Sequence, residues 1–191
     1  SFNLIAEGWN AGACTDMSYF MTQATNVGAV HAAGWNVSNV TTMYGMFYEC
    51  QKMKTLDVTG WDTSNVTNAQ FMFIRCRALV DFIGSGGLNF GKVVDMGSMC
   101  EGWDSMTYLD ATNWNCGSAT NMGQMFGWAL KLKTIKGIEN WDVSKNENFT
   151  TMFRYCYELE KLDLSTWKPS SGKTFNSMFS DCGKLNLDKD V

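Results

Sequence analysis

The stretch that decides the fold spans residues 56–67 and reads Leu56-Asp57-Val58-Thr59-Gly60-Trp61-Asp62-Thr63-Ser64-Asn65-Val66-Thr67. It opens with alternating apolar and polar residues, which is typical of a short strand with one buried face. A polar turn rich in Asp, Ser and Asn follows the tryptophan. Variants of this stretch recur along the chain, so the sequence is built from repeats.

Seven units become visible when one apolar residue per repeat is taken as position zero. These residues are Met17, Met43, Ala69, Met96, Met122, Phe149 and Phe175, spaced 26 or 27 apart. Eight residues before each of them stand Trp9, Trp35, Trp61, Leu88, Trp114, Trp141 and Trp167. A unit of this length cannot enclose a core of its own, so we expect the units to stack and share one.

Further columns explain the unusual content of methionine, tryptophan and cysteine. Three residues after position zero stand Phe20, Met46, Met72, Met99, Met125, Met152 and Met178, and seven after it stand Ala24, Cys50, Cys76, Trp103, Ala129, Cys156 and Cys182. Each residue is expected to pack on its equivalents in the neighbouring units. The high content of methionine, tryptophan and cysteine is therefore explained by the repeat architecture.

The pattern within one unit predicts a strand, a turn, a second short strand and a short helical turn. Alternation over 56–58, 162–164 and 185–187 indicates the strands. The spacing from Met46-Phe47 to Cys50 and Met53 is helical, so one α or 3₁₀ turn is expected there. We predict a β-rich repeat solenoid of about seven stacked coils of 26–27 residues, forming one domain over residues 1–191.

Composition and charge exclude several classes of function. Fifteen basic and 19 acidic residues give a net charge of −4, so no basic face for a nucleic acid is expected. The single histidine, His31, leaves little scope for histidine-based catalysis or zinc binding. No apolar run approaches the ~20 residues that span a bilayer, so no membrane insertion is expected within this chain. We expect no catalytic residues, no cofactor and no metal.

The cysteines and the glycosylation sequons bear on the cellular compartment. Seven cysteines without a CxxC pair predict reduced core residues, although a Cys50–Cys76 or Cys156–Cys182 disulfide stays open. Sequons for N-glycosylation occur at Asn36, Asn39, Asn65 and Asn148. They favour an extracellular or cell-surface location.

The repeat resembles the BspA-type leucine-rich repeat of bacterial, mycoplasmal and protist surface proteins. The pattern LDxSxWDTSNVTxMxxMFxxCxxLxxL carries the resemblance, and it covers essentially the whole chain. It implies a leucine-rich-repeat-like solenoid, a surface or secreted location and a binding or adhesion role. The fourth unit departs most, with Leu88 in the tryptophan column and glycines at 84, 86 and 87, so an irregular coil is expected there.

Function is expected on columns that point outward, because inward ones are constrained by packing. The positions five, six and eight after zero vary in character and include a candidate partner-binding face of Tyr48, Arg75, Arg77, Trp128, Tyr155 and Tyr157. Tyr, Trp and Arg dominate binding hot spots. The expected partner is a protein or a glycan at a surface.

The two ends suggest an alternative. Residues 2–5 and 185–188 show no polar capping unit of the kind that normally terminates a solenoid. The chain is then either a piece of a longer array or a structural subunit that stacks end to end into a filament or surface layer.

Overall fold

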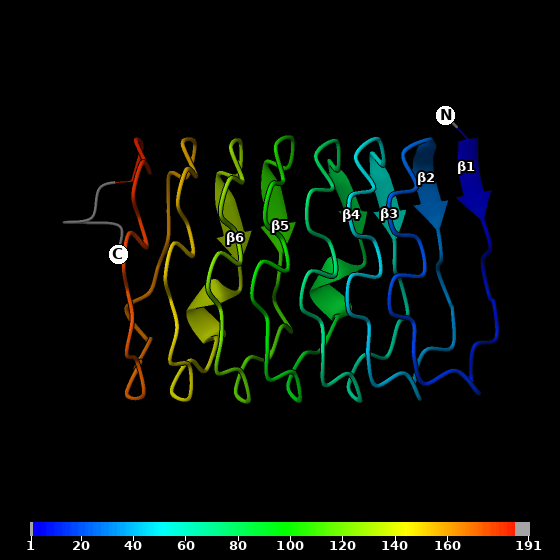
Figure 1. Ribbon diagram of the computed structural model, residues 1–191, viewed down its shortest axis with the longest axis horizontal. Helices are drawn as coiled ribbons and strands as arrows, with labels where there is room; N and C mark the ends of the chain where they lie inside the picture. Colours follow the sequence, from blue (N-terminus) through cyan, green and yellow to red (C-terminus); the bar gives the residue numbers. More distant parts are fainter. Residues whose placement is uncertain (1, 186–191) are drawn as a thin grey trace.

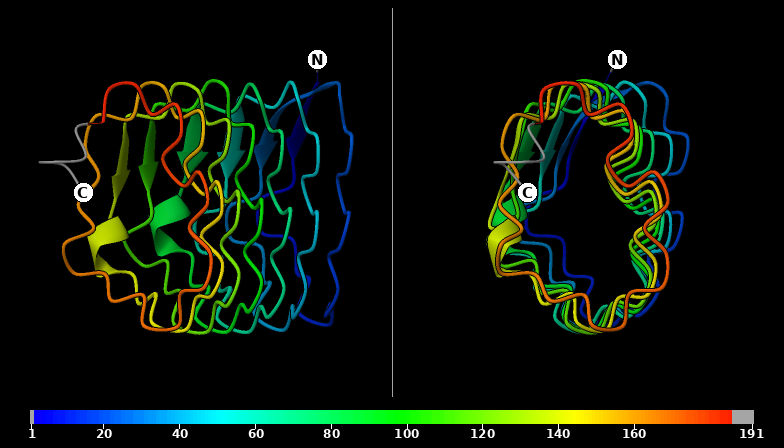
Figure 2. Two further views of the ribbon diagram at one scale, coloured as in Figure 1. Left: turned by 60° about the vertical axis from the view of Figure 1, so that its left-hand side comes forward. Right: turned by 90° about the vertical axis from the view of Figure 1, so that its left-hand side faces the viewer.

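The computed structural model describes residues 2–185 as a β-solenoid, a repeat fold that winds in successive coils around one elongated core (Figure 1). Viewed along the long axis, the coils superpose on one oval outline (Figure 2). Equivalent positions of successive units therefore lie one above the next, as the columns of the sequence predict.

One side of the oval, the strand wall, carries short parallel strands. The strands are β1 (Phe2–Ile5), β2 (Val27–His31), β3 (Thr55–Asp57), β4 (Asp81–Ile83), β5 (Tyr108–Asp110) and β6 (Thr134–Lys136). They form a four-stranded sheet in the order β1-β2-β3-β4 and a separate pair, β5-β6. Val30 pairs with Leu56 and Leu56 with Phe82, which keeps one apolar column in register.

Regular strands cover fewer coils than the seven expected. Within residues 2–185 six strands form, and the segment 162–164 is not one of them. Its neighbour Glu160 donates its amide to the Lys133 carbonyl at 3.2 Å, but the ladder does not continue beyond that bond. The strand expected over 185–187 lies outside the described residues except for Leu185.

The opposite side, about half a coil from each strand, is the turn wall, which runs from one residue before position zero to seven after it. Single parallel bridges link its first position from coil to coil, through Asp16, Thr42, Asn68, Asp95, Asn121, Asn148 and Thr174. Their asparagine and aspartate side chains accept a bond from the amide two residues later, as Asn121 Oδ1 does from Gly123 N at 3.0 Å. The wall is therefore held by both backbone and side-chain bonds.

The prediction of a helical turn on this wall is wrong. Within the described residues, helix is confined to the 3₁₀ helices η1 (Ser85–Gly87) and η2 (Ile138–Asn140), which lie elsewhere in the coil. The turn wall instead has left-handed residues at two and six positions after zero in every unit. These are Tyr19, Gln23, Gly45, Glu49, Phe71, Arg75, Ser98, Gly102, Gln124, Trp128, Thr151, Tyr155, Ser177 and Asp181. Positive φ angles cannot continue a right-handed helix, so consecutive i to i+3 turns form.

The two 3₁₀ helices explain the two unit spacings of 27 residues. Units with tight turns place Gly8, Gly34 or Gly60 at a positive φ just before the tryptophan column. In the fourth and sixth units, Gly84 and Gly137 take the positive φ three residues earlier, and η1 or η2 accommodates the extra residue. The irregularity expected in the fourth unit is present, and the sixth unit repeats it.

The core is a set of like side chains stacked along the axis. Trp9, Trp35 and Trp61 stack with ring centroids 5.1 and 5.7 Å apart, and Phe126 and Phe153 at 5.7 Å. Stacks of this kind add about 0.5–1.5 kcal/mol per pair beyond their burial. All seven cysteines are free thiols, so neither disulfide forms in this structure.

The left-handed glycine before η2 should tolerate no side chain. A Cβ on Gly137, at φ +88°, would lie 2.5 Å from the Thr112 Cα of the preceding coil. We expect Gly137→Ala to lower the free energy of unfolding by at least about 2 kcal/mol, because left-handed strain and a backbone clash add. The matched control is Gly87→Ala, whose Cβ meets no atom within 4 Å. Urea denaturation compares the two, and an equal effect would contradict this account of the turn.

Candidate functional site

Tyr48, Arg75, Trp128 and Tyr155 of the expected face lie on the turn wall, and Arg77 and Tyr157 lie one position beyond its end. The turns explain why the left-handed residues among them point outward. Arg75, Trp128 and Tyr155 are each a left-handed residue, with φ between 56° and 63°. Each stands between a buried aromatic residue two positions earlier and a buried small residue one position later, as Trp128 does between Phe126 and Ala129. Because its neighbours face the core, the left-handed residue projects into solvent.

Three of the six residues line one small hollow. Arg75, Arg77 and Trp128 border it together with Glu101, Asp104 and Leu130, and its volume is about 270 Å³. Both arginines are already paired across coils. Arg75 Nη1 lies 2.7 Å from Glu49 Oε1 and Arg77 Nη1 lies 3.0 Å from Asp104 Oδ2.

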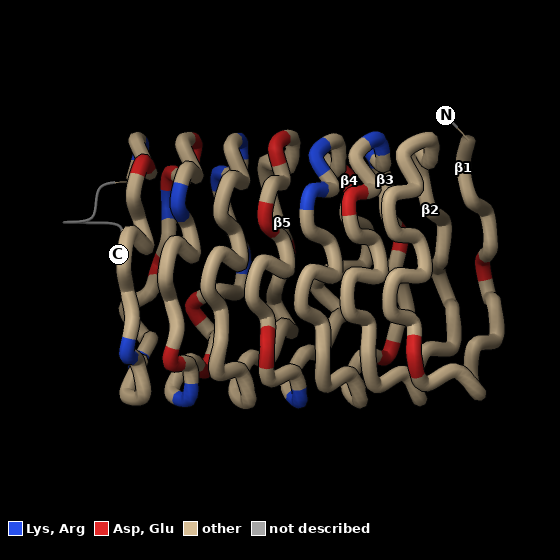
Figure 3. The backbone as a smooth tube through the Cα atoms, in the orientation of Figure 1, with Lys and Arg blue, Asp and Glu red and all other residues tan. Residues whose placement is uncertain are grey.

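These ion pairs set the electrostatics of the hollow. The Arg75 guanidinium holds the pKa of Glu49 below its ordinary value, chiefly through their hydrogen bond, and Glu49 raises the pKa of Arg75 in return. Each arginine charge at the hollow therefore already has a carboxylate partner, and this pairing does not favour an anionic ligand. Figure 3 likewise shows acidic and basic residues scattered over the coils, without a continuous patch of one sign in that view.

An aromatic cluster continues from the hollow into the next coil. The Trp128 ring lies 4.9 Å from that of Tyr155, whose ring lies 5.9 Å from that of Tyr157. Trp128 is 37% exposed and Tyr157 47% exposed. The structure thus brings five of the six expected residues together as one surface.

Sequence reasoning missed one member of this surface, Arg154. Its guanidinium carbon lies 4.5 Å from the centre of the Tyr155 ring and 5.9 Å from that of Trp128. Its Nη2 donates to the Tyr155 hydroxyl at 2.7 Å. A cation over an aromatic face is attracted by the ring quadrupole. The cue in the sequence was its position beside Tyr155 in a variable column. We call Arg75, Arg77, Trp128, Arg154, Tyr155 and Tyr157 the aromatic–arginine surface.

Tyr48 belongs to a different cluster. Its ring packs edge-on against Tyr19, with centroids 6.5 Å apart, and Tyr19 packs against Tyr44 at 5.2 Å. Tyr48 therefore packs with the tyrosines of the first two coils and not with the rings of Trp128, Tyr155 and Tyr157. Tyr48 stands three coils before Trp128.

The four sequon asparagines are placed unequally. Asn36 and Asn39 are exposed, whereas Asn65 and Asn148 are half-buried. The amide nitrogen of Asn65 donates to the Ser38 carbonyl at 2.8 Å, and that of Asn148 donates to Asn121 Oδ1 at 2.9 Å. The two exposed asparagines are bonded as well, since Asn36 Nδ2 donates to Asn10 Oδ1 at 3.3 Å and Asn39 Nδ2 donates to the Gly12 carbonyl at 2.6 Å. A glycan on any of the four would therefore disturb an inter-coil hydrogen bond.

The described residues also bear on metal binding and on membrane insertion. Within residues 2–185, no group of three or more His, Cys, Asp or Glu side chains is arranged to hold a metal ion. The same part of the chain contains no helix of the length and apolarity needed to cross a bilayer. His31 is half-buried at the end of β2.

Comparison with known proteins identifies a family. No curated protein and no solved structure matches the chain. Residues 1–110 and 94–190 both match a family described as "Mycoplasma protein of unknown function, DUF285". Since the two matches together span residues 1–190, the chain belongs to the DUF285 family.

Proposed function

We propose that this protein is a non-enzymatic binding or adhesion module of the cell surface or the secreted space, built as a BspA-like, leucine-rich-repeat-like solenoid. The aromatic–arginine surface would bind the partner, a protein or a glycan. The observation that carries the proposal is the clustering of exposed Trp128 and Tyr157 with Tyr155 and Arg154 on a rigid wall.

The energetics of such a surface favour binding. Aromatic rings held by backbone turns lose little conformational entropy when a partner covers them. Arg154 is already oriented by its hydrogen bond to the Tyr155 hydroxyl. Preorganised Tyr, Trp and Arg are the residues that dominate interface hot spots.

The titratable groups favour a role without catalysis. Carboxyl groups such as Asp62, Asp142 and Asp163 have a lowered pKa because each accepts bonds from a serine two residues later. Burial raises the pKa of the Cys50 and Cys182 thiols to about 11. The lowered carboxyl pKa values and the raised thiol pKa values both lie further from the range that suits a general acid, a general base or a thiolate nucleophile.

Removing the two central rings tests the proposal. We expect Trp128→Ala with Tyr155→Ala to weaken binding in a screen of immobilised glycans and extracellular-matrix proteins by about tenfold or more, because each ring is a hot-spot residue. The matched control is Tyr108→Ala, which removes a 50% exposed ring from β5 on the strand wall. Binding that survives the double change, or that is lost equally in the control, would contradict the proposal.

A second candidate function is end-to-end assembly as a structural subunit. It is favoured by apolar side chains exposed at the terminal coils, with Phe2 58%, Ile5 73%, Trp9 50% and Phe175 45% exposed. In the described part of the chain, β1 pairs with β2 only, so its other edge is open to a further strand.

Light scattering across a concentration series, with electron microscopy, separates the two candidates. Assembly predicts a mass that rises with concentration, and fibres that disappear in Ile5→Lys but persist in Val80→Lys. Val80 is a matched control, being 46% exposed and outside the terminal coils. A monomer of constant mass would contradict the assembly role.

A further inference from the structure

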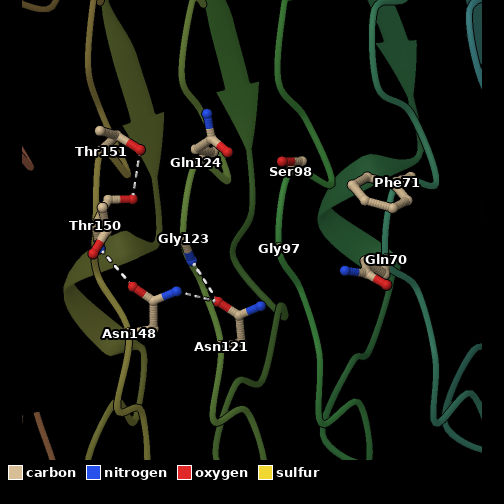
Figure 4. A pocket seen from close by; sticks show the side chains of 10 residues that line it. All are labelled: Gln70, Phe71, Gly97, Ser98, Asn121, Gly123, Gln124, Asn148, Thr150 and Thr151. Carbon is tan, nitrogen blue, oxygen red and sulfur yellow. Dashed lines mark hydrogen bonds between the residues drawn. The ribbon is translucent and has the colours of Figure 1, made fainter. Parts of the chain in front are cut away.

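A second hollow lies on the turn wall, and none of its lining residues belongs to the aromatic–arginine surface. It is an open groove of about 440 Å³ that crosses four successive coils, and we call it the amide groove (Figure 4). Gln70, Phe71, Ser98 and Gln124 border it, along with the asparagines of the bridge column. At a spacing of ~4.8 Å per coil, four coils give it a length of about 14 Å along the solenoid axis.

The floor of the groove is made by glycines whose backbone does not require glycine. Gly97 and Gly123 stand one residue after position zero, where Tyr44, Gln70 and Thr150 carry side chains in other coils. A Cβ on Gly123 would lie 2.6 Å from Asn148 Nδ2. Two consecutive glycines in this column therefore leave both a hollow and room for the asparagine ladder.

The polar groups of the groove divide into bonded and unbonded sets. Asn148 Nδ2 donates to Asn121 Oδ1, and Asn121 Nδ2 donates to Asp95 Oδ1, both at 2.9 Å. These side chains are already used between coils. Among the described residues, the side chains of Gln70 and Gln124 make no hydrogen bond within the protein. Each is an amide that offers donors and an acceptor together.

The side chains that line the groove are uncharged. None of the ten residues that line the groove is acidic or basic. The walls therefore favour a ligand that both donates and accepts hydrogen bonds without carrying charge. A chain of sugar hydroxyl groups has this character.

An aromatic row extends the groove toward the first coil. Phe71, at the groove's edge, packs edge-on against Tyr44 at 5.5 Å, and Tyr44 packs against Tyr19 at 5.2 Å. Tyr19 is 49% exposed. Aromatic rings pack well against the apolar C–H faces of sugar rings while neighbouring amides bond the hydroxyls. The row and the groove lie along the same axis, so one linear ligand can contact both.

An extended peptide fits this groove less well. Peptides that lie along a sheet-like surface gain affinity from unpaired backbone groups. Here the backbone is already paired between coils, since Ser98 N donates to Gly123 O and Gln124 N to Thr150 O, both at 2.9 Å.

We propose that the amide groove and its aromatic row bind a neutral, linear glycan lying along the solenoid axis, stacked on Phe71 and hydrogen-bonded by Gln70 and Gln124. This site is separate from the aromatic–arginine surface. Its ligand class follows from the absence of charge in the lining and from the two unused amides.

Glycine substitutions at left-handed positions allow a test in which loss of folding does not mimic loss of binding. Phe71 and Gln124 have φ of 59° and 57°, a conformation that glycine adopts readily. Phe71→Gly with Gln124→Gly removes the ring and one amide while leaving the backbone conformation favoured. Ser177→Gly, at φ 54° in the same column of the last unit, is the matched control.

Calorimetric titration with uncharged hexasaccharides of glucose and of N-acetylglucosamine supplies the readout. We expect the unaltered protein and Ser177→Gly to bind at least one of them with an affinity insensitive to salt. The double variant should bind it about tenfold or more weakly, through the lost stacking and hydrogen bonds. The inference is overturned if no hexasaccharide binds, if the double variant binds unchanged, or if Trp128→Ala alone abolishes binding.

Discussion

Backbone hydrogen bonds between equivalent positions of successive coils set the register of the whole molecule. On the turn wall, Phe47 donates to Met72, Phe73 to Met99 and Phe126 to Met152, each at 2.8–2.9 Å. Once this bond is in place, every side chain lies on its counterpart in the next repeat. The methionine, tryptophan and phenylalanine columns are consequences, because only like-sized residues stack on one another without leaving voids.

The same register also arranges the outward-facing side chains of the solenoid. Left-handed residues recur at two fixed positions in every coil, so outward side chains form rows parallel to the axis. The row two positions after zero supplies Phe71, Ser98 and Gln124 of the amide groove, and the row six positions after zero supplies Arg75, Trp128 and Tyr155 of the aromatic–arginine surface. Both surfaces are rigid, since each row is anchored by the i to i+3 turns that bury its neighbours. A repeat that is invariant inside can therefore vary its surface freely, residue by residue.

The solenoid and its columns could be predicted because buried positions repeat in residue type. The conformation of the turn wall could not be predicted, because a helix and consecutive i to i+3 turns give the same spacing of apolar residues by three or four positions. The sign of φ decides between them, and only Gly45 and Gly102 mark it by residue type. Twelve other left-handed positions are held by residues such as Thr151 that give no such signal.

The cysteine column also had a cause that the sequence did not reveal. Each thiol donates to a carbonyl of the preceding coil, as Cys76 Sγ does to Phe47 O at 3.2 Å, and Trp103 Nε1 makes the same bond to Phe73 O at 3.0 Å. A hydrogen-bond donor, more than small size, is what this column shares in those coils. The candidate surface was predicted in most of its residues, but Arg154 was missed because its contact depends on side-chain direction.

Hydrogen–deuterium exchange of the turn-wall amides tests the central claim most directly. If inter-coil bonds hold the register, the amides of Phe73, Cys100 and Phe126 in the middle coils exchange as slowly as those paired within β2 and β3. Their carbonyl partners lie in the next coil, at 2.9 Å in each case. Rapid exchange at these three amides, with slow exchange confined to the strand wall, would contradict the account.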